Sequence, residues 1–148
     1  MEKRNKSNDS KSKMNETKDE FQEKVIKIDR ITKVVKGGKR LAFRSLVISG
    51  NMKGSVGYGL GKAKEVPSAI KKAIDKSKKT QIKVNVINGT LPHQVIGEFS
   101  SSKVIIKPAK PGTGVIAGGA VRIILEYLGL KDVVAKSLGS GNPINTTK

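Results

Sequence analysis

The stretch GSVGYGLGKAKEVPSAIKKA, residues 54–73, contains the residue types that bind phosphate in many proteins. Glycines recur at alternate positions, lysines follow, and a segment with helical periodicity comes next. A nucleotide-hydrolase loop requires glycine, four residues, Gly-Lys and then a hydroxyl residue that holds magnesium. With the motif anchored on Gly61 and Lys62, the first glycine falls on Val56 and the hydroxyl on Ala63. Both requirements fail, so this is not such a loop.

Other nucleotide-binding patterns fail at the same place. A dinucleotide fingerprint needs a third glycine three residues after the second, where Lys62 or Lys64 stands. An RNA-recognition strand carries several aromatic residues for base stacking, and only Tyr58 is present. What remains is a glycine-rich strand and two lysines before the start of a helix, where backbone N–H groups and the helix dipole favour an anion. The pattern indicates phosphate contact without nucleotide chemistry.

Basic residues dominate the whole chain, which has 30 Lys and Arg, 12 Asp and Glu, and a net charge of +18 over 148 residues. Such an excess predicts a polyanionic partner. Residues 25–88 hold 16 basic and 3 acidic side chains, and residues 89–148 hold 7 and 3. Because only 3% of residues are aromatic, contact with the shape and phosphates of structured RNA is favoured over base stacking. Any single lysine can instead belong to a merely solvated face.

Several classes of site are excluded by composition. The chain has no cysteine, which excludes disulfides, cysteine-type zinc sites, iron–sulfur clusters and thiol nucleophiles. His93 is the single histidine, and we expect it to be structural. No apolar run approaches the ~20 residues of a membrane helix, and the amino terminus lacks a signal-peptide core. We therefore expect a cytoplasmic protein without a metal, a cofactor or a membrane partner.

The chain divides into three parts. Residues 1–24 have 7 basic and 6 acidic side chains and no apolar periodicity, which predicts a disordered polar extension. Residues 25–88 are expected to form a first domain and residues 89–148 a second. We find no internal repeat.

The first domain is predicted to be a three-stranded antiparallel sheet backed by one helix. Two β-rich runs around Gly37 and Gly38 form a hairpin, and SVGYGL forms the third strand. A cationic amphipathic helix begins near Val66, with Pro67 in its first turn. The alternation in QIKVNVI, residues 81–87, predicts a half-buried strand.

The second domain begins with the runs HQVIGEF and SKVIIKPA, which predict two strands. PGTGVIAGGAVRIILEYLG predicts a glycine-rich loop and a helix that Gly129 ends. LKDVVAKSLGSGNPIN predicts a strand or short helix and then a turn, with Pro143 starting a last helical turn.

Five sequence blocks occur together in the order of one known family: VVKGGKRLAF, VGYGLGKAKEVPSAIKKA, GTLPHQVIG, KPAKPGTGVIAGGAVR and KSLGSGNPIN. Over about residues 22–146 the chain resembles the bacterial small-subunit ribosomal protein S5 family. The resemblance implies an α+β fold of two small domains. The first is like a double-stranded-RNA-binding domain, and the second is a βαβ domain with a left-handed crossover.

The resemblance also implies a function. It is that of a structural constituent of the small ribosomal subunit, bound to its ribosomal RNA beside proteins S4 and S8, supporting assembly and translational accuracy. The place implied is near the messenger entry path and the decoding region. Residues 33–40 resemble the hairpin that reaches toward the head of the subunit near the spectinomycin site.

RNA contacts follow from the resemblance position by position. Ser55 stands where the family often has a basic residue, so we expect Lys53 to make that contact. Ser100 and Glu98 also depart from the family pattern, and the chain ends at NPINTTK, where relatives continue into a longer helix.

Glycines 112, 114, 118 and 119 either let RNA approach the backbone or serve tight turns and helix packing. The expected RNA-binding residues are Lys33, Lys36, Gly37, Gly38, Lys39, Arg40, Lys53, Lys62, Lys64, Lys71, Lys72, Lys103, Lys107 and Arg122.

Parts of the sequence also fit two other functions. PGTGVIAGGAV resembles the glycine loop of small-molecule kinases, but that chemistry needs magnesium carboxylates and a base. Glu98, Glu126 and Asp132 are scattered through the second domain, so we expect no enzyme activity. A free-standing RNA-binding or chromosome-coating protein would show the same charge pattern, and co-sedimentation with small subunits would separate it from a ribosomal protein.

Overall fold

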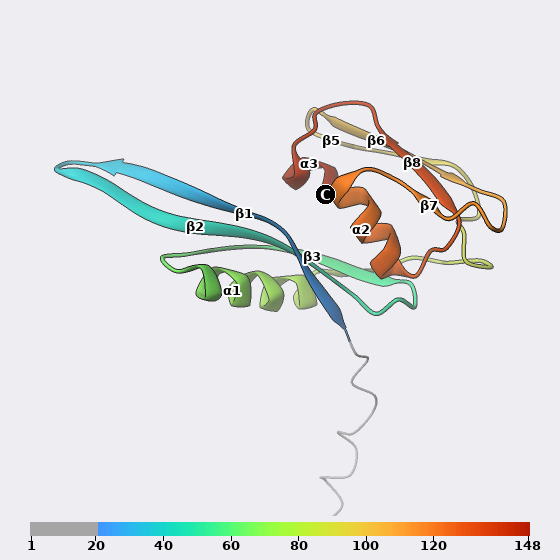
Figure 1. The fold of residues 1–148 in the computed structure, drawn as a ribbon, viewed down its shortest axis with the longest axis horizontal. Helices are drawn as coiled ribbons and strands as arrows, with labels where there is room; N and C mark the ends of the chain where they lie inside the picture. Colours follow the sequence, from blue (N-terminus) through green and yellow to red (C-terminus); the bar gives the residue numbers. More distant parts are fainter. Residues whose placement is uncertain (1–20) are drawn as a thin grey trace, which may run out of the picture.

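The structure, a computed structural model, describes residues 21–148. Two four-stranded sheets each carry helices (Figure 1), which confirms the predicted α+β class. The predicted domain boundary after residue 88 stays a prediction. The polar extension expected over residues 1–24 lies outside the described residues, except that residues 22–24 are the first of β1 rather than part of an extension.

The first sheet has the strand order β1-β2-β3-β4 and is antiparallel throughout. Its hairpin turn is Lys36 and Gly37, one residue earlier than predicted, and Gly38 begins β2. Gly37 has φ of +88°, a conformation that glycine adopts without a steric cost. The elements are β1 (Gln22–Val35), β2 (Gly38–Gly50), β3 (Ser55–Ala63), α1 (Val66–Lys79) and β4 (Gln81–Lys83).

The hairpin of β1 and β2 extends well beyond the rest of the first sheet (Figure 1). Strand β3 pairs with β2 only from Phe43 inward, so farther out the two strands pair only with each other. We call residues 31–42 the arm. It presents both faces and both edges of a two-stranded ribbon to the surroundings.

Helix α1 packs against β3 through small residues on both sides. Gly57, Gly59 and Gly61 face the helix, and a Cβ added at any of them would lie less than 3.0 Å from the helix backbone. The helix meets them with Ala69, Ala73 and Ser77, all fully buried. The alternating glycines therefore allow a strand to pack closely against a helix. This packing, and not phosphate binding, explains the glycine pattern of residues 57–61.

The strand predicted over residues 81–87 is wrong beyond Lys83. Ile82 is 60% exposed rather than buried, and the chain leaves the sheet after it. The reason is that Val84 and Val86 turn to the second unit and pack against its core. The Val84 N–H donates to the Gly54 carbonyl at 2.7 Å, and this hydrogen bond holds the chain where it leaves the sheet. The first sheet thus has the short β4 as a fourth strand instead of three strands alone.

The second sheet has the order β5-β6-β8-β7, and β7 and β8 are parallel, with α2 between them in sequence. This is the predicted βαβ unit, and its left-handed crossover stays a prediction. Gly129 ends α2 with φ of +91°, as predicted. The segment expected to be a strand or a short helix is a strand over residues 133–137. The elements are β5 (Val95–Phe99), β6 (Ser102–Pro108), β7 (Val115–Ile116), α2 (Gly119–Leu128), β8 (Val133–Ser137) and α3 (Pro143–Thr147).

The turn between β2 and β3 joins the two units through backbone hydrogen bonds. The N–H of Met52 donates to the carbonyl of Tyr127 at 3.0 Å, and that of Gly54 to the carbonyl of Leu128 at 2.9 Å. These carbonyls lie at the end of α2, where a helix leaves acceptors unpaired. Leu46 and Ile48, on the sheet face away from α1, are buried at this junction. The first sheet is therefore covered near its base, and the arm is left uncovered.

Candidate nucleic-acid interface

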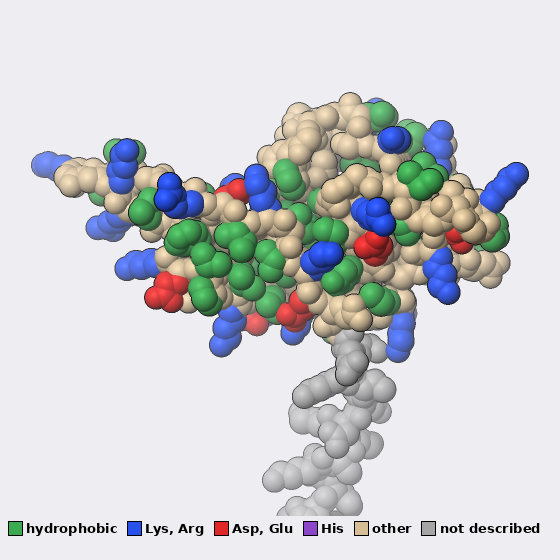
Figure 2. Space-filling model, in the orientation of Figure 1, with side chains coloured by type: hydrophobic (Ala, Val, Ile, Leu, Met, Phe, Trp, Pro, Cys, Tyr) green, Lys and Arg blue, Asp and Glu red, His purple; other side chains and the backbone are tan. Residues whose placement is uncertain are grey.

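The predicted basic residues of the hairpin gather on the arm (Figure 2). Lys33 pairs with Arg40 and Val34 with Lys39 across the two strands, and Lys36 lies in the turn. All four cations are exposed, and within residues 21–148 none forms an ion pair with an acidic side chain. A Cβ at Gly37 or Gly38 would meet nothing within 4 Å. The end of the arm is thus an open, uncompensated positive surface.

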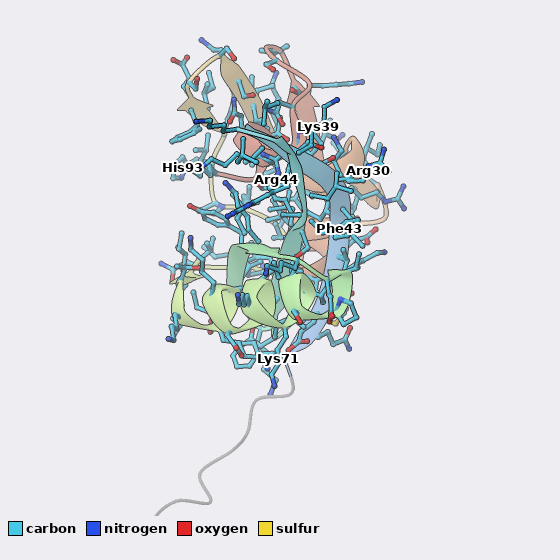
Figure 3. All side chains as sticks on the ribbon, turned by 90° about the vertical axis from the view of Figure 1, so that its left-hand side faces the viewer. Arg30, Lys39, Phe43, Arg44, Lys71 and His93 are labelled. Atoms are coloured by element: carbon cyan, nitrogen blue, oxygen red, sulfur yellow. The ribbon has the colours of Figure 1, made fainter. Side chains whose placement is uncertain are left out.

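A second group of predicted cations surrounds α1. Lys62 lies near the end of β3 and Lys64 just before the helix, and Lys71 and Lys72 are exposed on α1. Figure 3 shows Lys71 on the side of α1 that points away from the sheet. Glu65 occupies the N-cap position without a side-chain capping hydrogen bond, so a carboxylate stands where we expected an anion to be favoured. A phosphate bound here would therefore depend on the lysines more than on the helix end.

Lys53 lies in the turn between β2 and β3, where it is exposed. Its N–H donates to the Asn51 side-chain oxygen at 2.9 Å, and the N–H of Ser55 donates to the same oxygen at 3.0 Å. The turn that carries Lys53 is therefore held in place by Asn51.

In the second unit the predicted cations are in part compensated. Lys103 forms an ion pair with Glu98, and Arg122 donates from Nε to Glu126 at 2.8 Å. Lys107 is exposed on β6. These positions offer a phosphate less net charge than the arm does.

The glycines around the start of α2 are not packing positions. A Cβ at Gly112, Gly114, Gly118 or Gly119 would meet nothing within 4 Å. Three of them, all but Gly118, have positive φ, which indicates turns that need glycine. Of the structural roles expected for these four glycines, helix packing is therefore excluded and tight turns remain. The alternative role, close approach of RNA to the backbone, stays a prediction.

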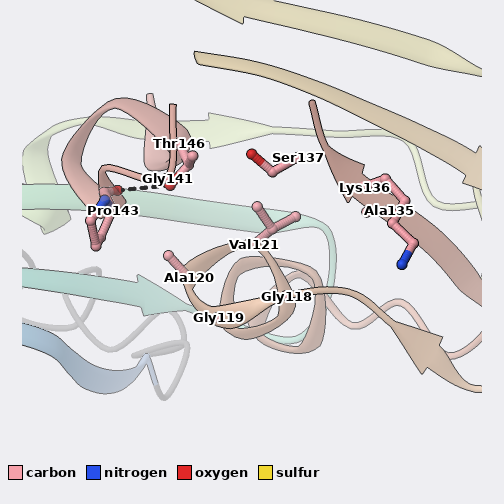
Figure 4. A pocket seen from close by; sticks show the side chains of 10 residues that line it. All are labelled: Gly118, Gly119, Ala120, Val121, Ala135, Lys136, Ser137, Gly141, Pro143 and Thr146. Carbon is pink, nitrogen blue, oxygen red and sulfur yellow. Dashed lines mark hydrogen bonds between the residues drawn. The ribbon is translucent and has the colours of Figure 1, made fainter. Parts of the chain in front are cut away.

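A hollow of about 200 Å³ lies beside the start of α2 (Figure 4). Its lining contains Lys136, Ser137 and Thr146 among glycine and apolar residues, and no acidic side chain or histidine. A kinase-like site would need carboxylates here to hold magnesium. In the described part of the chain no three His, Asp or Glu side chains are grouped to bind a metal. Nor is any described helix long and apolar enough to cross a membrane.

The structure adds one cluster that the sequence did not suggest. Asp29 accepts a hydrogen bond from an Nη of Arg44 at 2.7 Å, and its other oxygen lies 3.1 Å from Lys27 Nζ. The hydrogen bonds from Arg44 and Lys27 hold the pKa of Asp29 below its usual value. Asp29 and Arg44 are fifteen positions apart in the sequence, and only the hairpin register brings them together. The observed turn at Lys36 and Gly37 sets this pairing, whereas the turn predicted at Gly37 and Gly38 would have placed Leu46 opposite Asp29.

Comparison with known proteins matches both units. Residues 21–85 match the family described as ribosomal protein S5, N-terminal domain, and residues 97–148 match ribosomal protein S5, C-terminal domain. Small ribosomal subunit protein uS5 of Thermotoga maritima is 57% identical over 127 residues, which are 86% of this chain and 71% of that protein. The proteins of the same name from Thermotoga petrophila and Thermotoga neapolitana are 56% and 57% identical over the same length.

Proposed function

Because the chain belongs to the ribosomal protein S5 family, we propose that it is a structural constituent of the small ribosomal subunit that binds ribosomal RNA through phosphate and shape contacts. The observation that carries this proposal is the open positive surface of the arm. Its four cations have no acidic partner within residues 21–148, and a folded RNA supplies the opposite charge. The near absence of aromatic residues supports phosphate contact over base stacking.

The contacts proposed first are those of Lys36, Lys39, Lys62, Lys64 and Lys71, all exposed around the arm and α1. The arm is the element that reaches away from the body of the protein (Figure 1), so it enters RNA that the rest of the chain does not touch. We place it near the messenger entry path and the decoding region, with proteins S4 and S8 as neighbours. In this proposal the protein is cytoplasmic and supports assembly and translational accuracy.

A free-standing RNA-binding protein is the second candidate, since the same cations would serve it. Co-sedimentation separates the two: the proposed protein pellets with small subunits at moderate salt, and a free binder stays in the supernatant. An enzyme is not proposed, because the hollow beside α2 has no acidic lining residue.

Lysine reactivity tests the proposed contacts. The protein is acetylated alone and in assembled small subunits, and each lysine is quantified by mass spectrometry. Lys36, Lys39, Lys62, Lys64 and Lys71 are expected to lose reactivity on assembly. Equal reactivity of these five lysines in both samples would reject the proposed interface.

A further inference from the structure

The face of the first sheet that points away from α1 carries a row of cations that includes residues outside the predicted site. Asp29, Arg44 and Lys62 lie side by side on β1, β2 and β3. Because side chains alternate between faces and Gly61 faces α1, Lys62 and its two neighbours point the other way. Lys27, Lys33 and Arg40 share their face. We call Lys27, Lys33, Arg40, Arg44 and Lys62 the basic strip.

The strip is open to the surroundings. Side chains of Lys27 and Arg44 are 48% and 31% exposed, and Lys33, Arg40 and Lys62 are exposed as well. Seen along the arm, Arg44 lies on one side of the sheet, and Arg30 and Phe43 lie on the other (Figure 3). Figure 1 shows that the second unit stands above the base of this face and leaves the arm clear. A chain of phosphates could therefore run along the arm on this side.

Arg44 is held in one orientation with donors to spare. One Nη donates to Asp29, and the Nε is buried without a hydrogen-bond partner in the described structure, so the donors left for a phosphate are the remaining N–H groups of the two Nη atoms. A guanidinium presents five N–H donors in a planar fork that suits two oxygens of a phosphate. Asp29 also holds Lys27, so one carboxylate fixes the direction of two cations. Against five cations, this single acid leaves the strip strongly positive.

We infer that the basic strip is a second phosphate-binding surface for ribosomal RNA, in which Arg44 contacts phosphate and Asp29 is a positioning residue that orients Arg44 and Lys27. The inference rests on the proposed function and extends it to the sheet face opposite α1. It gives the first sheet two RNA-facing regions: the end of the arm, and the strip that runs from Lys33 and Arg40 on the arm to the sheet beside it.

Whether Asp29→Asn raises or lowers the affinity for RNA shows whether Asp29 positions Arg44 or only adds a negative charge. Asp29→Asn makes the protein more positive by one charge, so electrostatics alone would tighten binding to RNA. If Asp29 positions Arg44, the same substitution weakens binding to small-subunit ribosomal RNA by roughly threefold to tenfold. Asp75→Asn, on the exposed side of α1, makes the same charge change without releasing a cation from an ion pair. It is expected to leave binding unchanged or to tighten it.

A double-mutant cycle shows whether Asp29 acts through Arg44. Arg44→Ala is expected to weaken binding and to lower the steepness of the salt dependence by about one. In the Arg44→Ala background, Asp29→Asn should cause little further loss, because the group that it orients is gone. Asp29→Glu, which can keep the ion pair, should restore most of the affinity. Circular dichroism establishes that each variant is folded before binding is measured.

Three outcomes overturn the inference. Tighter binding by Asp29→Asn, equal to that of Asp75→Asn, would leave Asp29 as a plain opposing charge. Unchanged RNA binding by Arg44→Ala, with weaker incorporation into subunits, would assign the face to a protein neighbour. If Lys36→Ala with Lys64→Ala weakens binding while the Asp29 and Arg44 variants do not, the proposed function stands and only this inference fails. If the two lysine changes have no effect either, the proposed function fails first.

Discussion

At the scale of single residues, the glycines of β3 are explained by the atoms that face them. Gly57, Gly59 and Gly61 lie against the backbone of α1, and there is no room for a Cβ at any of them. Their alternation resembles a phosphate loop only in the printed sequence. In the folded chain their place is taken up by the helix, so RNA cannot reach this side of the glycines.

Gly59→Ala is expected to destabilise the protein by about 2–3 kcal/mol, because the added methyl would meet the backbone of Ala73 and Ser77. The free energy of unfolding in urea measures this effect. Gly97→Ala is the matched control, since a Cβ there meets nothing within 4 Å, and it should change stability little. A Gly59→Ala protein as stable as the original, with weaker RNA binding, would favour a phosphate cradle instead.

Asp29 predicts a pH dependence of stability. Its pKa is lowered in the folded state by hydrogen bonds from Arg44 and Lys27, so its contribution is full above the unfolded value of about 3.9. That contribution is lost as the pH falls through the lower, folded pKa. At neutral pH, Asp29→Asn should therefore cost about 1 kcal/mol, as is usual for a partly exposed ion pair.

The stability difference between the original protein and Asp29→Asn should shrink as the pH falls below about 4. Urea unfolding at neutral pH and near pH 3 gives the two differences. The account of the ion pair would be wrong if the difference stayed constant over this range. Asp75→Asn, which breaks no ion pair that the structure shows, serves as the control.

At the scale of elements, the arm depends on its turn. Gly37 has φ of +88° and nothing near it, so the turn needs a backbone conformation but no packing space. Gly37→Val should strain the turn by roughly 1–2 kcal/mol and let the outer arm open, while the rest of the sheet stays folded. Hydrogen exchange of backbone amides should rise in residues 31–42 and stay unchanged in β3 and α1.

Gly37→Asn is the control for the arm, because asparagine tolerates this conformation better than a β-branched residue does. It should keep both the protection of the arm and its affinity for RNA. Global loss of protection in Gly37→Val would mean that the turn is needed by the whole sheet, contrary to this account.

The elements were predictable from sequence wherever a strong local signal marked them. The hairpin glycines, the helical period after Val66 and the stop at Gly129 each specify a local conformation. Both helices are where they were expected, and the hairpin turn lies one residue earlier. The strand over residues 81–87 was not, because Val84 and Val86 are drawn to a core formed by distant residues. An alternating apolar pattern indicates that side chains are buried, but it does not indicate which of two cores buries them.

The candidate site divides in the same way. Exposed lysines on the arm could be predicted because several basic residues stand close together around a glycine turn. The pairing of Asp29 with Arg44 could not be read from composition, because it depends on hairpin register. The ion pairs of Lys103 with Glu98 and of Arg122 with Glu126 were likewise recognised only from the structure.

At the scale of the whole molecule, charge and shape are arranged together. The two units share a junction where the turn between β2 and β3 satisfies the last carbonyls of α2, so the base of the first sheet is fixed. The arm extends from that base, and none of its four cations has an acidic partner within residues 21–148. Like charges gathered on so slender an element repel each other. The arrangement therefore suits a protein whose arm is surrounded by RNA phosphates.

The salt dependence of binding to small-subunit ribosomal RNA tests this central claim most directly. With about five phosphate contacts, a plot of log affinity against log salt concentration should have a slope of about −4 or steeper. Removing Lys36 or Lys64 by substitution with alanine should make the slope less steep by about one each. A slope near zero, unchanged by these substitutions, would contradict an interface built on phosphate contacts.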